Sequence, residues 1–172
     1  FLNSSSEPQM YLSFYILNTI FIMLSAAMMV FITESKSFIA NHSEKILITA
    51  AAIFSIGLSQ FVVVPYDVSS YFFLLVFFYF LLKYLEEQSV SRLVILGVII
   101  LISTFNRESS ALSLSLAATL LYSRFGLKKK SIVPVAVLGL VFIGVYFGLR
   151  LMSGYFTTND GNLLVQNFTE PK

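Results

Sequence analysis

The chain has 172 residues, of which 57% are hydrophobic and 12% are charged, and its mean hydropathy is +0.84. A soluble domain carries about 25% charged residues, so this composition excludes an ordinary soluble domain and indicates a membrane protein. The net charge of +2 is too small to indicate a nucleic-acid partner. The chain has no cysteine and a single histidine, which excludes a disulfide framework, a thiol nucleophile and a cysteine-rich zinc site. We expect neither a metal nor a cofactor.

Apolar segments follow one another along the chain, and a span of a bilayer needs about 20 such residues. The segments 10–32 and 46–64 meet this requirement. The segment 69–84 is short unless its basic end reaches the headgroups by snorkelling. The final segment, 132–150, has Pro134 in its first turn, where proline is tolerated. These segments predict helices that cross a membrane.

The region 90–125 allows two interpretations because Arg107 and Glu108 interrupt an otherwise apolar run. It forms either one long helix with this pair at the bilayer centre, or two spans, 90–105 and 109–124, that meet in a tight hairpin. A charged side chain at the bilayer centre is costly and seldom occurs without a purpose.

The distribution of basic residues favours the hairpin, because cytoplasmic loops are enriched in Lys and Arg. With a hairpin, eight of the eleven basic residues share one side, in the loops 33–45, 83–92 and 124–131. With a single helix the split is six against four, with Arg107 in the membrane. We therefore predict one all-α domain over 1–172, a polytopic bundle of about six transmembrane helices. Both termini, including a tail at 151–172, are expected on the extracytoplasmic side.

This orientation brings four polar residues to the outer side: Asp67, Asn106, Arg107 and Glu108. The two helices that flank the hairpin contain fewer apolar residues than a full span needs, so the hairpin is expected to be recessed below the outer membrane surface. Non-helical backbone at membrane depth is tolerated where it is buried in protein or lines a watery cavity. Such a cavity, with one cation and two carboxylates, suits an anionic lipid headgroup, because the planar fork of arginine can bind two phosphate oxygens.

A purely structural interpretation of the same residues stays open. Arg107 can pair with Asp67 and hold two helices together. Glu108 can cap the following helix, since acidic residues favour the N-terminal end. Asn106 can be a turn residue and nothing more.

Gly144 and Gly148 form a Gly-x-x-x-Gly pair in the final segment. Small residues at this spacing let two helices approach closely. We expect the pair to pack against another helix of the same chain rather than to form a dimer.

A family resemblance rests on two stretches of the chain. The first begins with Tyr66-Asp67-Val68 and runs to Tyr84, and the second continues from 93–104 into Phe105-Asn106-Arg107-Glu108. Their order resembles the central part of bacterial GT-C superfamily glycosyltransferases, which include relatives of protein mannosyltransferases and the aminoarabinose transferase. The resemblance covers about residues 60–125.

The resemblance implies transfer of a sugar from a polyprenyl-phosphate carrier at the outer face of the bacterial inner (plasma) membrane. Arg107 would bind the carrier phosphate, and Asp67, Glu108 and Asn106 would orient the headgroup or the acceptor. The catalytic acidic residues of the family usually lie in a first large external loop, which this chain lacks. Because the chain begins with Phe1 rather than Met, we expect a fragment whose catalytic loop lies upstream, so the catalytic residues are unknown.

Two other functions are compatible with the same residues. In a transporter or flippase, Asp67, Arg107 and Glu108 would line a substrate path at a helix break. In a non-enzymatic multi-pass protein, Asp67 and Arg107 would form a structural pair.

Overall fold

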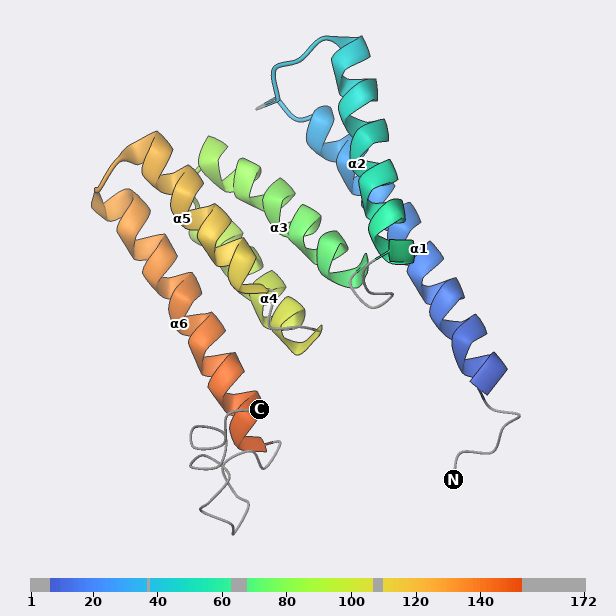
Figure 1. Ribbon diagram of the computed structural model, residues 1–172. Helices are drawn as coiled ribbons and strands as arrows, with labels where there is room; N and C mark the ends of the chain where they lie inside the picture. Colours follow the sequence, from blue (N-terminus) through green and yellow to red (C-terminus); the bar gives the residue numbers. More distant parts are fainter. Residues whose placement is uncertain (1–6, 37, 63–67, 107–109, 153–172) are drawn as a thin grey trace, which may run out of the picture.

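The computed structural model describes residues 7–36, 38–62, 68–106 and 110–152. The described secondary structure is entirely helical, which confirms the expected all-α fold with six helices (Figure 1). The helices are α1 (Glu7–Thr33), α2 (His42–Val62), α3 (Val68–Glu86), α4 (Val90–Asn106), α5 (Ala111–Phe125) and α6 (Lys129–Met152).

Three stretches of helix are long and apolar enough to cross a bilayer: Leu12–Thr33, Val68–Glu86 and Lys129–Leu149. They belong to α1, α3 and α6. Helices α4 and α5 are also apolar but have only 17 and 15 residues. At 1.5 Å per residue they are about 25 and about 22 Å long, less than the roughly 30 Å of a hydrocarbon core. The fold is thus that of a helical membrane protein in which three helices are long enough to span a bilayer and two apolar helices are shorter.

The helices run alternately up and down, so that three connections lie at one end of the bundle (Figure 1). We call this end the basic end; its connections are 34–41, 87–89 and 126–128. A hydrogen bond of 3.1 Å from the side-chain amide of Gln88 to the carbonyl of Lys130 joins the connection 87–89 to the first turn of α6. The loops that the sequence analysis assigned to one side therefore lie together in the fold.

Helix α3 lies at the centre of the molecule and packs against α1, α4 and α5. On the α1 side the contact is aromatic, with ring centroids 5.6 Å apart for Phe21 and Phe72 and 6.3 Å apart for Phe31 and Tyr79. On the other side lies the hydrophobic core, which is formed by α3, α4, α5 and α6. Its buried members are Phe77, Leu81, Tyr84, Leu85, Leu96, Ile99, Ile100, Ala117, Leu121 and Leu138.

Local sequence signals set two of the helix ends. The backbone N–H of Asn41 donates to the carboxylate of Glu44 at 2.8 Å, half of the reciprocal arrangement known as a capping box. Helix α2 therefore begins at His42, four residues before the expected apolar segment. At the end of α5, Gly126 has φ 65° and its N–H bonds the carbonyl of Tyr122 at 2.8 Å. Glycine adopts this backbone conformation without the steric cost that other residues incur.

Pro134 lies inside α6 and not in its first turn, because the helix begins at Lys129. A proline has no N–H, so the carbonyl four residues earlier loses its helical donor. That carbonyl belongs to Lys130, and it is the one that accepts the hydrogen bond from Gln88. The connection between α3 and α4 thus replaces the donor that Pro134 removes from α6.

This replacement predicts a coupling between Gln88 and Pro134. Gln88→Ala should lower the free energy of unfolding by about 1 kcal/mol, because the Lys130 carbonyl loses its protein donor. In a Pro134→Ala background, where alanine supplies a backbone N–H, the same substitution should cost less than half as much. Unfolding of the four variants in mixed micelles measures this difference. An equal cost in both backgrounds would contradict the proposed exchange of donors.

The expected packing of the Gly-x-x-x-Gly pair within the chain is not found among the described residues. A Cβ atom built on Gly144 or Gly148 meets no atom within 4 Å. The reason is topological, because α6 lies at the edge of the bundle, where it contacts α4 and α5 (Figure 1).

Candidate functional site

A polar contact joins the end of α4 to the beginning of α3. The side-chain oxygen of Asn106 accepts a hydrogen bond from the Ser69 hydroxyl at 3.1 Å. Its side-chain nitrogen lies 3.0 Å from the Ser69 hydroxyl and 3.5 Å from that of Ser70. Asn106 is the last residue of α4, and the two serines occupy the first turn of α3. One side chain therefore links residues 37 positions apart in the sequence.

A second polar contact joins α4 to the start of α5. The hydroxyls of Thr104 and Ser110 are 2.9 Å apart, and Thr104 also donates to the carbonyl of Ile100 at 2.7 Å. Both side chains are buried. A buried hydroxyl without a partner is costly in an apolar surrounding, so this pairing stabilises the contact between the end of α4 and the residue that precedes α5. We call Ser69, Ser70, Thr104, Asn106 and Ser110 together the polar junction.

The predicted break between 90–105 and 109–124 is confirmed as a break between two helices. Helix α4 ends at Asn106 and α5 begins at Ala111, and the two run in opposite directions (Figure 1). A single long helix over this region is therefore wrong. The physical reason is that α3 packs against both α4 and α5. A single helix that continued straight from α4 would carry the α5 residues away from α3, and this second contact would be lost.

Of the four predicted site residues, the structure describes Asn106 alone. Asp67, Arg107 and Glu108 lie outside the described residues. Asn106 does more than occupy a turn, because it bonds a neighbouring helix. The partners Ser69, Ser70, Thr104 and Ser110 were missed in the sequence analysis. A signal for them was present, since all four are hydroxyl residues at the ends of apolar helices, within three residues of Asp67, Arg107 or Glu108.

The polar junction by itself supplies neutral donors and acceptors of hydrogen bonds. It can orient a polar headgroup, but it supplies no charge for a phosphate and no acid or base. Within residues 7–36, 38–62, 68–106 and 110–152, no three His, Cys, Asp or Glu side chains are close enough to hold a metal ion. The charged residues nearest to the polar junction along the chain are Asp67, Arg107 and Glu108.

The polar junction gives a measurable contribution to stability. Asn106→Leu and Ser69→Ala should each destabilise the protein, with a coupling energy of about 0.6–1.7 kcal/mol, as found for hydrogen bonds between membrane helices. A double-mutant cycle followed by denaturation in mixed micelles measures the coupling. Ser115→Ala is the matched control, because this exposed serine bonds only the carbonyl of Ala111 in its own helix. A coupling near zero would show that the Asn106–Ser69 contact is not formed in solution.

Comparison with known proteins gives no relative. No protein-family model, no curated protein and no solved structure matches the chain. The fold and composition therefore define the class alone, a helical membrane protein with three helices that can span a bilayer.

Proposed function

We propose that the chain is part of an integral membrane glycosyltransferase of the GT-C type, which transfers a sugar from a polyprenyl-phosphate carrier at the outer face of a bacterial plasma membrane. The observation that carries the proposal is the contact between Asn106 and Ser69. Along the chain, Arg107 follows Asn106 directly, and Asp67 precedes Ser69 by two residues. The candidate carrier-binding residues therefore belong to two segments that this contact joins.

In this proposal Arg107 binds the carrier phosphate through its planar guanidinium, while Asp67 and Glu108 orient the sugar or the acceptor. Two features of the fold support the placement. The short lengths of α4 and α5 favour a loop recessed below the membrane surface, where polar backbone requires a cavity. The basic end lies at the opposite end of the helices, and basic loops favour the cytoplasmic side.

Substitution of Arg107 in the full-length protein tests the phosphate role. Arg107→Ala should weaken binding of a polyprenyl phosphate in nanodiscs at least tenfold, because a charge-assisted hydrogen bond contributes about 1.5–3 kcal/mol. Arg107→Lys should also weaken it, since a point charge does not reproduce the bidentate fork. Arg124→Lys, at the basic end, is the control and should leave binding unchanged. Unchanged affinity in both Arg107 variants would overturn the phosphate role.

A non-enzymatic membrane protein is the second candidate, and the polar junction is the observation in its favour. Hydrogen bonds between three helices at one end of the bundle are also what a structural clamp requires. In that case Asp67→Asn and Arg107→Gln should show coupled losses of stability, with no effect on carrier binding. Loss of carrier binding with stability intact would favour the transferase.

A further inference from the structure

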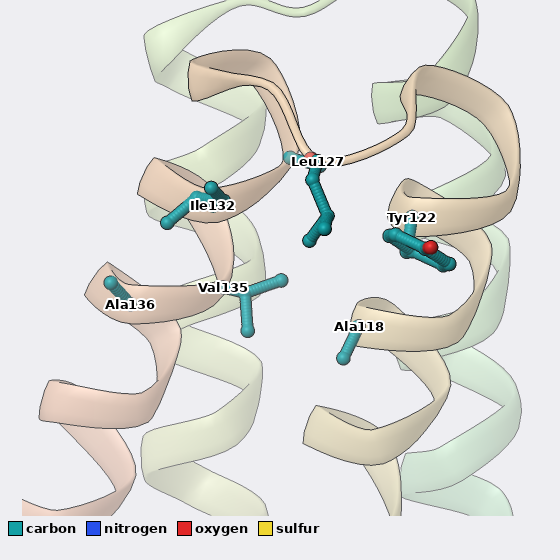
Figure 2. Close-up of a pocket in the computed structure, with 7 residues that line it drawn as sticks. Ala118, Tyr122, Leu127, Ile132, Val135 and Ala136 are labelled. Atoms are coloured by element: carbon teal, nitrogen blue, oxygen red, sulfur yellow. The ribbon is translucent and has the colours of Figure 1, made fainter.

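A groove between α5 and α6 opens at the basic end of the bundle. Figure 2 shows Leu127 pointing from the connection into the space between the two helices, with Tyr122 on one side and Val135 on the other. The groove has a volume of about 290 Å³. The six labelled residues that line it are all apolar or aromatic: Ala118, Tyr122, Leu127, Ile132, Val135 and Ala136.

The only other residue of the lining, Ser131, does not make the groove polar. Its hydroxyl donates to the carbonyl of Lys128 at 2.9 Å and to that of Gly126, both in the connection above the groove. The groove is therefore lined mainly by hydrocarbon. An apolar ligand would be stabilised there by packing and by the removal of its surface from water. Along α5 the lining extends from Ala118 to the connection, a depth of roughly 10 Å.

Four basic residues lie next to the groove-lining residues along the chain. Arg124, Lys128, Lys129 and Lys130 are all exposed and lie on the last turn of α5, the connection and the first turn of α6. Neither of the two ion pairs found within the described residues, Lys45–Glu34 and Arg92–Glu87, involves any of the four.

The adjoining ends of α3 and α4 and the connection between them add charge of both signs to this part of the basic end. With Arg92 there are five basic residues, against the two acidic residues Glu86 and Glu87, an excess of three positive charges. Lys83 is not counted, because its ammonium lies 5.6 Å from the ring of Tyr79, on the α1 side of α3. The bond from Gln88 to Lys130 keeps this connection beside α6. The charge around the groove is thus strongly positive even with the carboxylates included.

An apolar slot beneath a cluster of cations matches one kind of molecule in a membrane. An anionic phospholipid carries its negative charge directly above its acyl chains, and basic residues at the membrane surface attract such lipids. We propose that the α5–α6 groove is a binding site for an anionic phospholipid. One acyl chain lies against Ala118, Tyr122 and Val135, beneath Leu127 as drawn in Figure 2, and the headgroup phosphate lies beside Lys128 and Lys129. This site is independent of the sugar transfer proposed above and lies at the other end of the helices.

The absence of tryptophan from the chain allows a direct test in vesicles of defined composition. Tyr122→Trp introduces a single tryptophan at the groove, which can be excited selectively over the tyrosines, and lipids brominated on the acyl chain quench it on contact. We expect brominated phosphatidylglycerol to bind at this position about fivefold more strongly than brominated phosphatidylcholine. Phe31→Trp is the matched control, because Phe31 is 58% exposed and Tyr122 55%, both near the basic end. There we expect no preference.

Two further variants, each with a matched control, distinguish a defined binding site from a general attraction of lipid to the basic surface. Lys128→Gln with Lys129→Gln should reduce the preference at position 122 to below twofold, whereas Lys36→Gln with Lys45→Gln removes the same charge elsewhere and should not. Ala118→Phe fills the groove and should reduce quenching by both lipids, while Ala51→Phe on the exposed side of α2 should not. An equal preference at positions 122 and 31, or one that survives loss of Lys128 and Lys129, would overturn the proposal.

Discussion

Replacing Phe77 by alanine is expected to lower the free energy of unfolding by about 2–3 kcal/mol. The side chain is completely buried at the centre of the core shared by α3, α4, α5 and α6. In a soluble protein such a truncation costs about 3–5 kcal/mol, which combines a transfer term and a cavity term. In a membrane the transfer term is small, because lipid is as apolar as the core, so the lost packing dominates. Denaturation in mixed micelles measures the loss.

The matched control for this prediction is Phe54→Ala. Phe54 lies on α2 and is 70% exposed, so its removal leaves no cavity and should change stability by less than about 0.5 kcal/mol. If the two substitutions cost the same, the core between α3 and α6 would not be formed as described.

Gly126→Ala is expected to destabilise the protein by about 1–3 kcal/mol, although there is open space around the residue. No atom lies within 4 Å of a Cβ built there, so the cost is not steric contact with neighbours. The backbone at Gly126 has φ 65° and ψ −165°, a conformation that is essentially restricted to glycine. Alanine must either adopt this strained conformation or change the path of the α5–α6 connection. Unfolding in mixed micelles measures the cost.

Gly97→Ala is the control that distinguishes the cost of a positive φ from the general effect of replacing glycine by alanine. Gly97 lies in the middle of α4, and a Cβ there also meets nothing within 4 Å. Because its φ is not positive, alanine should stabilise the helix by roughly 0.5–1 kcal/mol. Opposite signs for the two glycines are therefore expected. A stabilising effect at Gly126 would mean that the connection does not require a positive φ.

The two proposed lipid-binding sites lie at opposite ends of the bundle. At one end the polar junction joins α3, α4 and α5 next to Asp67 and Arg107, which the proposed function assigns to a carrier lipid. At the other end the α5–α6 groove lies next to the exposed residues Lys128 and Lys129 and is proposed to hold an anionic phospholipid. The Arg107 and Lys128 variants are independent, because each test reads a different lipid at a different end.

The ends of the helices show how accurately hydropathy predicts helix boundaries. The expected boundaries at 90 and 105 differ from those of α4 by at most one residue. Helix α6 begins at Lys129, three residues before the expected apolar segment, because lysine is a good helix former and its charge remains solvated at the helix end. Hydropathy detects which residues prefer lipid, whereas a helix continues for as long as its backbone hydrogen bonds are formed.

The amino-acid sequence alone determined the class of the protein, the helices and the loops that carry the basic residues. These are properties of neighbouring residues, so composition and charge over short windows predict them. Only the tertiary structure decided that Asn106 bonds Ser69, that Gln88 bonds the carbonyl left free by Pro134, and that α5 and α6 leave a groove between them. Each of these features joins segments that are brought together by helix packing, and packing depends on the shapes of all the contacting side chains at once.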